Sequence, residues 1–597
     1  MAADGNPAEA LSLSAGKSEP AEAETSGPGR LSEVLDEAIW ALLARSTGGA
    51  SPIALATAWY DWLSHMAISP GHRTRLGLDA SREWMHALRD VWLDAAGVAM
   101  EKRWQPGPVM ETALRGYGRA YSHWADWLSA TVSQPNGVSS ANARRVAFTM
   151  RQALEAFHPR NFLWTNPDAL AATQAERGAN LARGWMHLIQ DMQAQLGLPA
   201  TRAERPALGE KLAATPGKVV YRNRLIELIQ YAPAGDTVKA EPILITPAWI
   251  LKFYILDLNS ESSLVRYLVE QGYTVFMISW RNPSREHRDL GFDDYRQLGV
   301  LSAIEAIQAL MPGNRIHGVG YCLGGTLLSV TAADLARNGD DPFASLTLLA
   351  AQVDFRDAGE LSIFIDEAQL AALNAGMDAA GYLHGHQMAA AFTLLRSREL
   401  VWRRVQEEYL MGRRGQLIDL MVWNGDTTNM PYRMHSEYLR HFFLDNDFVQ
   451  GRFVIDGKPV AVSDIRAPVF ALGTTKDHVA PWRSVFKIHL FADTEVTFVL
   501  ATGGHNAGVV SPPGHPRRRH GIHTRADCEH YIDPDTWLEI AEEREGSWWP
   551  SWVEWLGAHS SGEVPAPEPV RAELPGNELP AGASLPDAPG DYVREGA

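Results

Sequence analysis

The sequence predicts an α/β protein in which an all-helical N-terminal domain precedes a larger domain built on a mostly parallel sheet. Three observations lead to this prediction. A chain of 597 residues is too long for one ordinary hydrophobic core. Residues 31–215 place apolar side chains at helical spacing, whereas residues 216–558 alternate short apolar runs with helical segments, as βαβ units do. With 46% hydrophobic and 21% charged residues, the chain has the composition of a globular protein.

The two ends of the chain differ from the rest in composition. Residues 1–30 are rich in Ala, Glu, Ser, Gly and Pro, and residues 559–597 are rich in Pro and acidic side chains. Such segments bury too little apolar surface to offset the entropy lost on ordering. We therefore expect both to be disordered acidic tails.

Residues 31–215 contain stretches such as IALATAWYDWLSHMA and ANLARGWMHLIQDM, in which apolar residues follow the helical period. Strand-like alternation is scarce there. Four tryptophans of this region, Trp59, Trp62, Trp84 and Trp92, are most simply core residues. The alternative is an exposed aromatic face for a partner or a lipid-like surface.

The later domain begins with four apolar runs that read as strands buried on both faces, at residues 242–246, 274–279, 315–320 and 345–351. Helical segments lie between them. The alternation stops after Asp354 and resumes at 467–474 and 496–502. Because the gap is too long for a structureless loop, we expect a helical cap over about residues 356–445.

Composition excludes several classes of protein. A net charge of −17 argues against nucleic-acid binding, which needs clustered Lys and Arg. We find neither a secretory signal nor a run of roughly 18 apolar residues that would span a membrane. Two cysteines, Cys322 and Cys528, do not make a disulfide framework, so a reducing cytoplasm is the natural setting. No motif predicts a metal or another cofactor.

Cys322 lies in the stretch GYCLGG, residues 320–325, where a predicted strand runs into a small-residue helix. This is the G-x-S-x-G nucleophile elbow of α/β-hydrolases with cysteine in place of serine. Glycines flank the nucleophile because its strained turn leaves no room for side chains. The alternative is an ordinary buried cysteine. Cys528 has no such setting.

A nucleophilic thiol needs a base, and α/β-hydrolases order the triad as nucleophile, acid and histidine. Asp477 follows the strand at 467–474, and His505 follows the strand at 496–502 in a glycine-rich turn. We predict that Cys322, Asp477 and His505 are catalytic. Asp354 remains an alternative acid, and His478 an alternative histidine.

An oxyanion hole of this fold uses the backbone N–H after the nucleophile and another from the loop after an early strand. The first belongs to Leu323. The second lies in TPAWILKF, near Trp249 or Ile250, and we take Ile250 as the candidate. Trp249 could equally be packing beneath the pocket.

At this point the chain resembles the polyhydroxyalkanoate synthases. The resemblance spans about residues 52–556 and rests on TPAWILKFYILDL, VFMISWRNPS, GYCLGGTLL, TTKDHVAPW, GGHNAGVVSPP and GSWWPSWVEWL. The helical N-terminal region and the GYCLGG elbow are similar to class I of the family. The departures are the acidic tails and a basic insertion at 514–530, which is more simply a solvated loop than a site for coenzyme A phosphates.

The resemblance implies an acyltransferase that polymerises short-chain (R)-3-hydroxyacyl-CoA through an acyl thioester on Cys322 and releases coenzyme A. It implies a homodimer in the cytoplasm, associated with the polyester granule and its coating protein. Asp477 either orients His505 or activates the attacking hydroxyl. The cap, with Trp423, would gate entry or form a dimer contact. The alternatives are an acyl-CoA thioesterase of the same fold and a non-catalytic granule scaffold.

Overall fold

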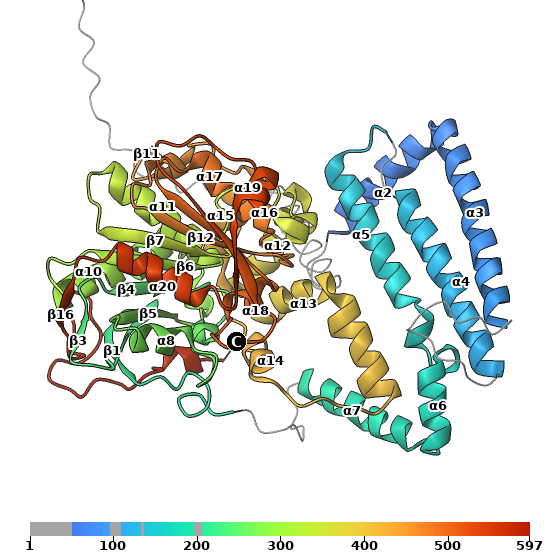
Figure 1. Ribbon diagram of the computed structural model, residues 1–597, viewed down its shortest axis with the longest axis horizontal. Coiled ribbons are helices and arrows are strands. Elements are labelled where there is room, and N and C mark those ends of the chain that lie inside the picture. Colours follow the sequence, from blue (N-terminus) through green and yellow to red (C-terminus); the bar gives the residue numbers. More distant parts are fainter. Residues whose placement is uncertain (1–50, 96–108, 133–135, 196–205, 597) are drawn as a thin grey trace, which may run out of the picture.

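A computed structural model describes residues 51–95, 109–132, 136–195 and 206–596. The predicted N-terminal tail, residues 1–30, lies outside the described residues. The described chain forms a helical body, drawn from blue to teal in Figure 1, beside an α/β body that contains all the long strands. The predicted fold class is confirmed. No helix among the described residues is both long and apolar enough to cross a membrane.

Three helices of the helical body begin at residues whose side chains cap them. Ser51 accepts a hydrogen bond from the backbone N–H of Ala54, and Ser139 caps a later helix in the same way. Asn166 accepts from two backbone amides at the start of a third. The helices are α2 (Pro52–Ala67), α3 (Pro70–Ala95), α4 (Val109–Val132), α5 (Ser140–Ala156), α6 (Pro167–Ala175) and α7 (Ala179–Gln195).

The four tryptophans that we expect in the core of the helical body differ in exposure. Trp59 and Trp62 are half-buried and pack edge to face against each other beside a small core. Trp84 and Trp92 are instead 66% and 70% exposed on α3. Assigning all four to the core was therefore wrong for Trp84 and Trp92, because helical periodicity alone does not say which face of a helix is covered.

The α/β body is organised on a ten-stranded sheet in the order β1-β2-β5-β4-β6-β7-β12-β13-β14-β15. The central strands β5, β4, β6, β7, β12 and β13 run parallel, and both edges are antiparallel. The strands are β1 (Gly217–Arg222), β2 (Ile226–Tyr231), β4 (Ile243–Thr246), β5 (Val275–Trp280), β6 (Ile316–Tyr321), β7 (Phe343–Leu349), β12 (Val469–Thr474), β13 (Val496–Ala501), β14 (Arg519–Arg525) and β15 (Glu542–Glu545). The six predicted strands are the six central ones.

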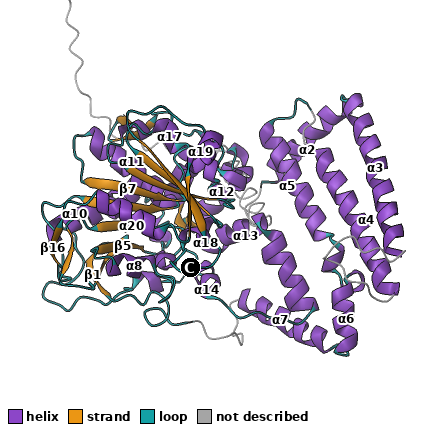
Figure 2. Ribbon diagram, in the orientation of Figure 1, coloured by secondary structure: helices purple, strands orange, loops and turns teal. Residues whose placement is uncertain are grey.

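Helices cover both faces of this sheet (Figure 2). One hydrophobic cluster includes residues of α10 (Ser302–Leu310) and α11 (Leu323–Arg337), and the other includes residues of α8 (Leu264–Glu270) and α20 (Trp549–Ala558). On β4, Leu244 belongs to the first cluster and Ile243 and Ile245 to the second. This alternation is why the central strands are apolar throughout.

A helical insertion separates β7 from β12, in the region where we expect a cap. Its helices are α12 (Glu367–Ala380), α13 (Gly385–Leu395), α14 (Asp419–Asn424) and α15 (Tyr432–Tyr438), with the short pairs β8 (Tyr382–Leu383) with β9 (Met430–Pro431) and β10 (Phe453–Ile455) with β11 (Lys458–Val460). The part after α13 lies against α7, where Asn180 donates to the carbonyl of Leu410 and Arg414 pairs with Asp191. The cap thus joins the two bodies (Figure 1).

The C-terminal segment corrects one expectation. Residues 559–596 are not a disordered tail: β16 (Glu563–Pro565) pairs with β3 (Thr237–Lys239), and the chain then runs along the outer edge of β1. The amide of Ala572 donates to the carbonyl of Val220, and the amide of Ala588 to that of Gly217. Overall composition suggested disorder, but a sheet edge needs partners for its backbone groups, and this segment supplies them.

Candidate active site

Cys322 stands at the turn between β6 and α11, with φ 53° and ψ −124°. This region of backbone conformation is strained for a residue with a side chain, and it recurs at functional sites. A Cβ added to Gly320 would lie 2.3 Å from the Cα of Gly325, and one added to Gly324 would lie 2.1 Å from the carbonyl oxygen of Thr246. The glycines are therefore required by close backbone contacts, as the elbow motif predicts.

Asp477 and His505 meet on the loops that follow β12 and β13. His505 begins the short helix α18 (His505–Val509), and its Nδ1 lies 2.7 Å from Asp477 Oδ2. The other oxygen of Asp477 accepts hydrogen bonds of 2.8 Å from the amides of Val479 and Ala480. The carboxylate is fully buried and held in place, so it fixes the orientation of the imidazole.

The charges of this pair reinforce each other. Burial by itself would lower the pKa of His505, but the charges and hydrogen bonds of Asp477 and Cys322 outweigh it and raise that pKa well above its ordinary value. Burial would likewise raise the pKa of Asp477, and the His505 charge lowers it instead. The structure thus brings the three predicted residues together, with an imidazole that can hold a proton beside the thiol.

Two further side chains form hydrogen bonds to the loop that carries His505, and the sequence analysis did not select them. The Tyr321 hydroxyl donates to Asn506 Oδ1 at 2.7 Å, and the Tyr321 ring lies 5.6 Å from the His505 ring. Arg518 donates to the carbonyl of Thr502 at 2.9 Å. Their positions in the sequence could have indicated them, because Tyr321 is next to Cys322 and Asn506 is next to His505.

The alternatives for acid and histidine are placed differently. Asp354 is fully buried and ion-paired with Arg356 at 2.6 Å, and it also accepts from Asn446. His478 is exposed on the loop after Asp477. The carboxylate in contact with His505 is that of Asp477.

The predicted oxyanion residues lie on two segments that touch. Leu323 is the first residue of α11, directly after Cys322. Ile250 is buried in the loop after β4, and its carbonyl accepts from the amide of Thr428 in the cap at 3.1 Å. Trp249 is buried and meets three aromatic rings edge to face. The packing interpretation of Trp249 is therefore correct, and the donor role of Ile250 remains a prediction.

The insertion contributes aromatic side chains to the hydrophobic clusters against which Cys322 packs. Tyr438 of α15 is buried, and its pKa is raised first by burial and then by the charge of Cys322. Trp423 of α14 is 1% exposed, and its Nε1 donates to the carbonyl of Lys252 at 2.7 Å. The ring is thus buried within its own chain, and the gating and dimer roles of the cap remain predictions.

The basic insertion is also structured. Residues 519–525 form β14, which pairs with β13, so this part is a strand rather than the expected solvated loop. Arg525 is buried and donates to the carbonyls of Ala492 and Thr494. Arg525 and Arg518 therefore form hydrogen bonds to backbone carbonyls within the fold.

A cavity of about 390 Å³ opens between α5, the segment 356–363 and the loop after β12. Its lining includes Arg144, Arg151, Arg356, Asp477 and His478. Two carboxylates, Asp357 and Glu360, line it as well. Arg151 and Arg356 already pair with Glu360 and Asp354, each at 2.6 Å.

Comparison with known proteins identifies the family of the chain. The family models for the poly-beta-hydroxybutyrate polymerase N-terminus match residues 100–268 and 30–72, and the α/β-hydrolase fold matches residues 241–512. The poly(3-hydroxyalkanoate) polymerase of Methylorubrum extorquens is 42% identical over 82% of this chain and 79% of its own length. The corresponding polymerase subunit of Rhizobium meliloti is 37% identical, over 95% of this chain and 94% of the relative. The polymerase subunit of Cupriavidus necator is 34% identical over 94% of this chain and 95% of its own length. The chain therefore belongs to the poly(3-hydroxyalkanoate) polymerases, acyl-transferring enzymes on an α/β-hydrolase fold.

Proposed function

We propose that this polymerase joins short-chain (R)-3-hydroxyacyl units from their coenzyme A thioesters through a covalent acyl-Cys322 intermediate. The contact between His505 and Asp477 beside a strained cysteine carries the proposal. Resemblance to class I favours the short-chain substrate. We also propose, on the resemblance alone, a cytoplasmic homodimer.

The first half-reaction loads the enzyme. His505 takes the proton of Cys322, and the thiolate attacks the thioester carbonyl of the acyl-CoA. The amides of Leu323 and Ile250 are the proposed donors to the oxyanion. The bond to coenzyme A breaks, the departing thiolate takes the proton from His505, and the acyl group remains on Cys322 as a thioester.

The second half-reaction extends the chain. The 3-hydroxyl of a bound hydroxyacyl-CoA gives its proton to His505 and attacks the acyl-Cys322 carbonyl. An oxygen ester forms, and the Cys322 sulfur leaves and takes the proton back from His505. The extended acyl-CoA then reloads Cys322 and releases coenzyme A. A thioester intermediate retains the activation of the substrate, so each ester forms downhill, and this explains cysteine in the elbow.

Asp477 has two proposed roles, and its contacts favour orientation of His505. One of its oxygens is occupied by two backbone amides and the other by the imidazole. An Asp477→Asn variant distinguishes the roles. An orienting role predicts loss of both acylation and elongation, whereas activation of the hydroxyl predicts that Cys322 is still acylated but chains do not grow.

The decisive experiment supplies purified protein with (R)-3-hydroxybutyryl-CoA. Free coenzyme A is measured by its thiol, and the acyl product is weighed. Insoluble polyester with coenzyme A release, both lost in Cys322→Ala but kept in Cys528→Ala, supports the proposal. Free 3-hydroxybutyrate without polymer would make the chain a thioesterase, and activity in Cys322→Ala would exclude the acyl-cysteine. Unchanged granule binding without any turnover would favour the scaffold.

We also propose that the helical body contacts the polyester granule or its coating protein. Its exposed aromatic residues, Trp84, Trp92, Trp124, Trp164 and Trp185, support this. Aromatic side chains suit a boundary between an apolar phase and water. Changing Trp84 and Trp92 to Ser is expected to lower the fraction that sediments with granules without changing turnover of soluble substrate, and an unchanged fraction would contradict this contact.

A further inference from the structure

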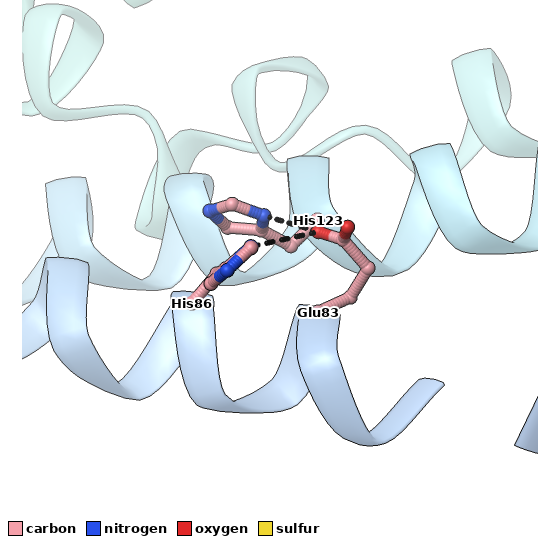
Figure 3. A group of neighbouring side chains, drawn as sticks. All are labelled: Glu83, His86 and His123. Atoms are coloured by element: carbon pink, nitrogen blue, oxygen red, sulfur yellow. Dashed lines mark hydrogen bonds and ion pairs between the residues drawn. The ribbon is translucent and has the colours of Figure 1, made fainter. Parts of the chain in front are cut away.

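Four side chains that could hold a cation converge between α3 and α4, in the helical body and away from the cysteine. Glu83, His86 and Asp90 project from one face of α3, since residues three, four and seven apart share a helix face. His123 projects from α4 toward them. Figure 3 shows Glu83, His86 and His123 directed at one another across the two helices.

The distances suit a shared ion. His123 Nδ1 lies 2.8 Å from Glu83 Oε2, and His86 Nδ1 lies 3.9 Å from the same oxygen. One ligand atom from each of these residues lies within 4.8 Å of the others. Two ligands of a tetrahedral zinc ion at the usual bond lengths are about 3.4 Å apart, so the two distances lie on either side of the ideal.

Both nitrogens of His123 face carboxylate oxygens. Nε2 lies 3.1 Å from Asp90 Oδ2, opposite the contact of Nδ1 with Glu83. A neutral imidazole has only one N–H, and if it points to Asp90 the lone pair of Nδ1 faces an oxygen lone pair of Glu83. Either a second proton or a metal ion must lie between them.

The position of His86 helps to distinguish the two explanations, a second proton or a metal ion between His123 and Glu83. A doubly protonated His123 would donate to Glu83 at 2.8 Å and to Asp90 at 3.1 Å, so these three residues alone could form an ion triad. A triad does not use His86, whose side chain is 49% exposed. A metal ion does use it, as a third ligand on the open side of the cluster.

We propose that Glu83, His86 and His123 bind one divalent transition-metal ion, with zinc as the best fit, and that Asp90 accepts a hydrogen bond from His123. Two imidazoles and a carboxylate are ligands that zinc accepts, and a carboxylate behind a metal-binding histidine is a common arrangement. The ion joins α3 to α4. Because Glu83 and His86 are partly exposed, water completes the coordination and the ion exchanges with solvent.

A second cluster of similar composition does not support a comparable proposal. His441, Asp445 and Asp447 also lie close together, in the cap. There Arg452 pairs with Asp447 at 2.9 Å, so one of the three candidate ligands already has a cationic partner.

The test titrates the full chain with ZnCl2 by calorimetry, and repeats it with CoCl2 to follow the visible absorption of bound cobalt. Wild type is expected to bind one more zinc ion than His86→Ala, whose affinity at this site falls by at least about 10-fold. His530→Ala, which removes an exposed histidine near Cys528, is the matched control and should bind as wild type does.

A second measurement keeps the result independent of other zinc-binding groups. Hydrogen exchange of the α3 and α4 amides is expected to slow with ZnCl2 in wild type and to stay unchanged in His86→Ala, with equal turnover in both proteins. Equal zinc binding and equal protection in the two proteins would overturn the proposal. So would the absence of any zinc effect on α3 and α4, which would leave a protonated His123 triad.

Discussion

Tyr592 gives a sharp test of whether the C-terminal segment is part of the fold. Its side chain is 5% exposed, its hydroxyl donates to the carbonyl of Asn223 at 2.7 Å, and two guanidinium groups, Arg222 and Arg281, lie over its ring. Its backbone carbonyl accepts from the buried ammonium of Lys252 at 3.0 Å. The residue thus joins the end of the chain to the loop after β4.

Truncating this ring removes its buried contacts. Tyr592→Ala is expected to lower the free energy of unfolding by about 4 kcal/mol, as for other buried aromatic side chains. Tyr592→Phe should lower it by only about 1 kcal/mol, since it loses one hydrogen bond. Val570→Ala, at an exposed position of the same segment, should change it by less than about 0.5 kcal/mol.

The assay is urea unfolding followed by tryptophan fluorescence, with coenzyme A release measured on the same samples. If Tyr592→Ala unfolds at the same urea concentration as Val570→Ala, the segment does not pack on the sheet edge and our correction of the predicted tail is wrong. The graded order of the three variants is the result that the structure requires.

Three further predictions follow from the site and the core. Asp477→Asn is expected to reduce coenzyme A release by roughly 10²–10⁴-fold and to lower the pKa of His505 seen in the pH–rate profile; an unchanged profile would contradict the pairing. Burial lowers the pKa of His435 to about 4, so this histidine is neutral in the fold but protonated in the unfolded chain below its ordinary pKa near 6.5. Stability should therefore fall as the pH drops from about 6.5 toward 4, by about 2 kcal/mol at pH 5, and His435→Gln should show a smaller loss between pH 8 and pH 5 in urea titrations. Gly324→Ala should abolish turnover because its Cβ would lie 2.1 Å from a backbone carbonyl, whereas Gly557→Ala, with nothing within 4 Å in α20, should retain activity; an active Gly324→Ala would show that the elbow can relax.

Much of the catalytic body was predictable from local pattern. A buried parallel strand is apolar along its whole length, and the six central strands all have that signature. The elbow was equally visible, because a cysteine between glycines at the end of such a strand has a steric reason to be there. The chain order of Cys322, Asp477 and His505 followed from the position of each after a strand.

Other features depended on contacts between distant segments. Trp84 and Trp59 occur in similar helical patterns, yet one is exposed and the other half-buried, because the neighbouring helices cover only part of each surface. Tyr438 lies more than a hundred residues from Cys322 in the chain, and only the fold of the cap brings it into the hydrophobic cluster against which Cys322 packs. No local pattern encodes such a pairing.

The sequence by itself determined the fold class, the family and the three candidate catalytic residues, because strand burial, turn sterics and short motifs are local properties. The tertiary structure decided the rest: which carboxylate holds His505, where the C-terminal segment packs, and how α3 and α4 bring Glu83, His86 and His123 together. Those outcomes depend on distances between residues far apart in the chain, and such distances exist only once the chain has folded.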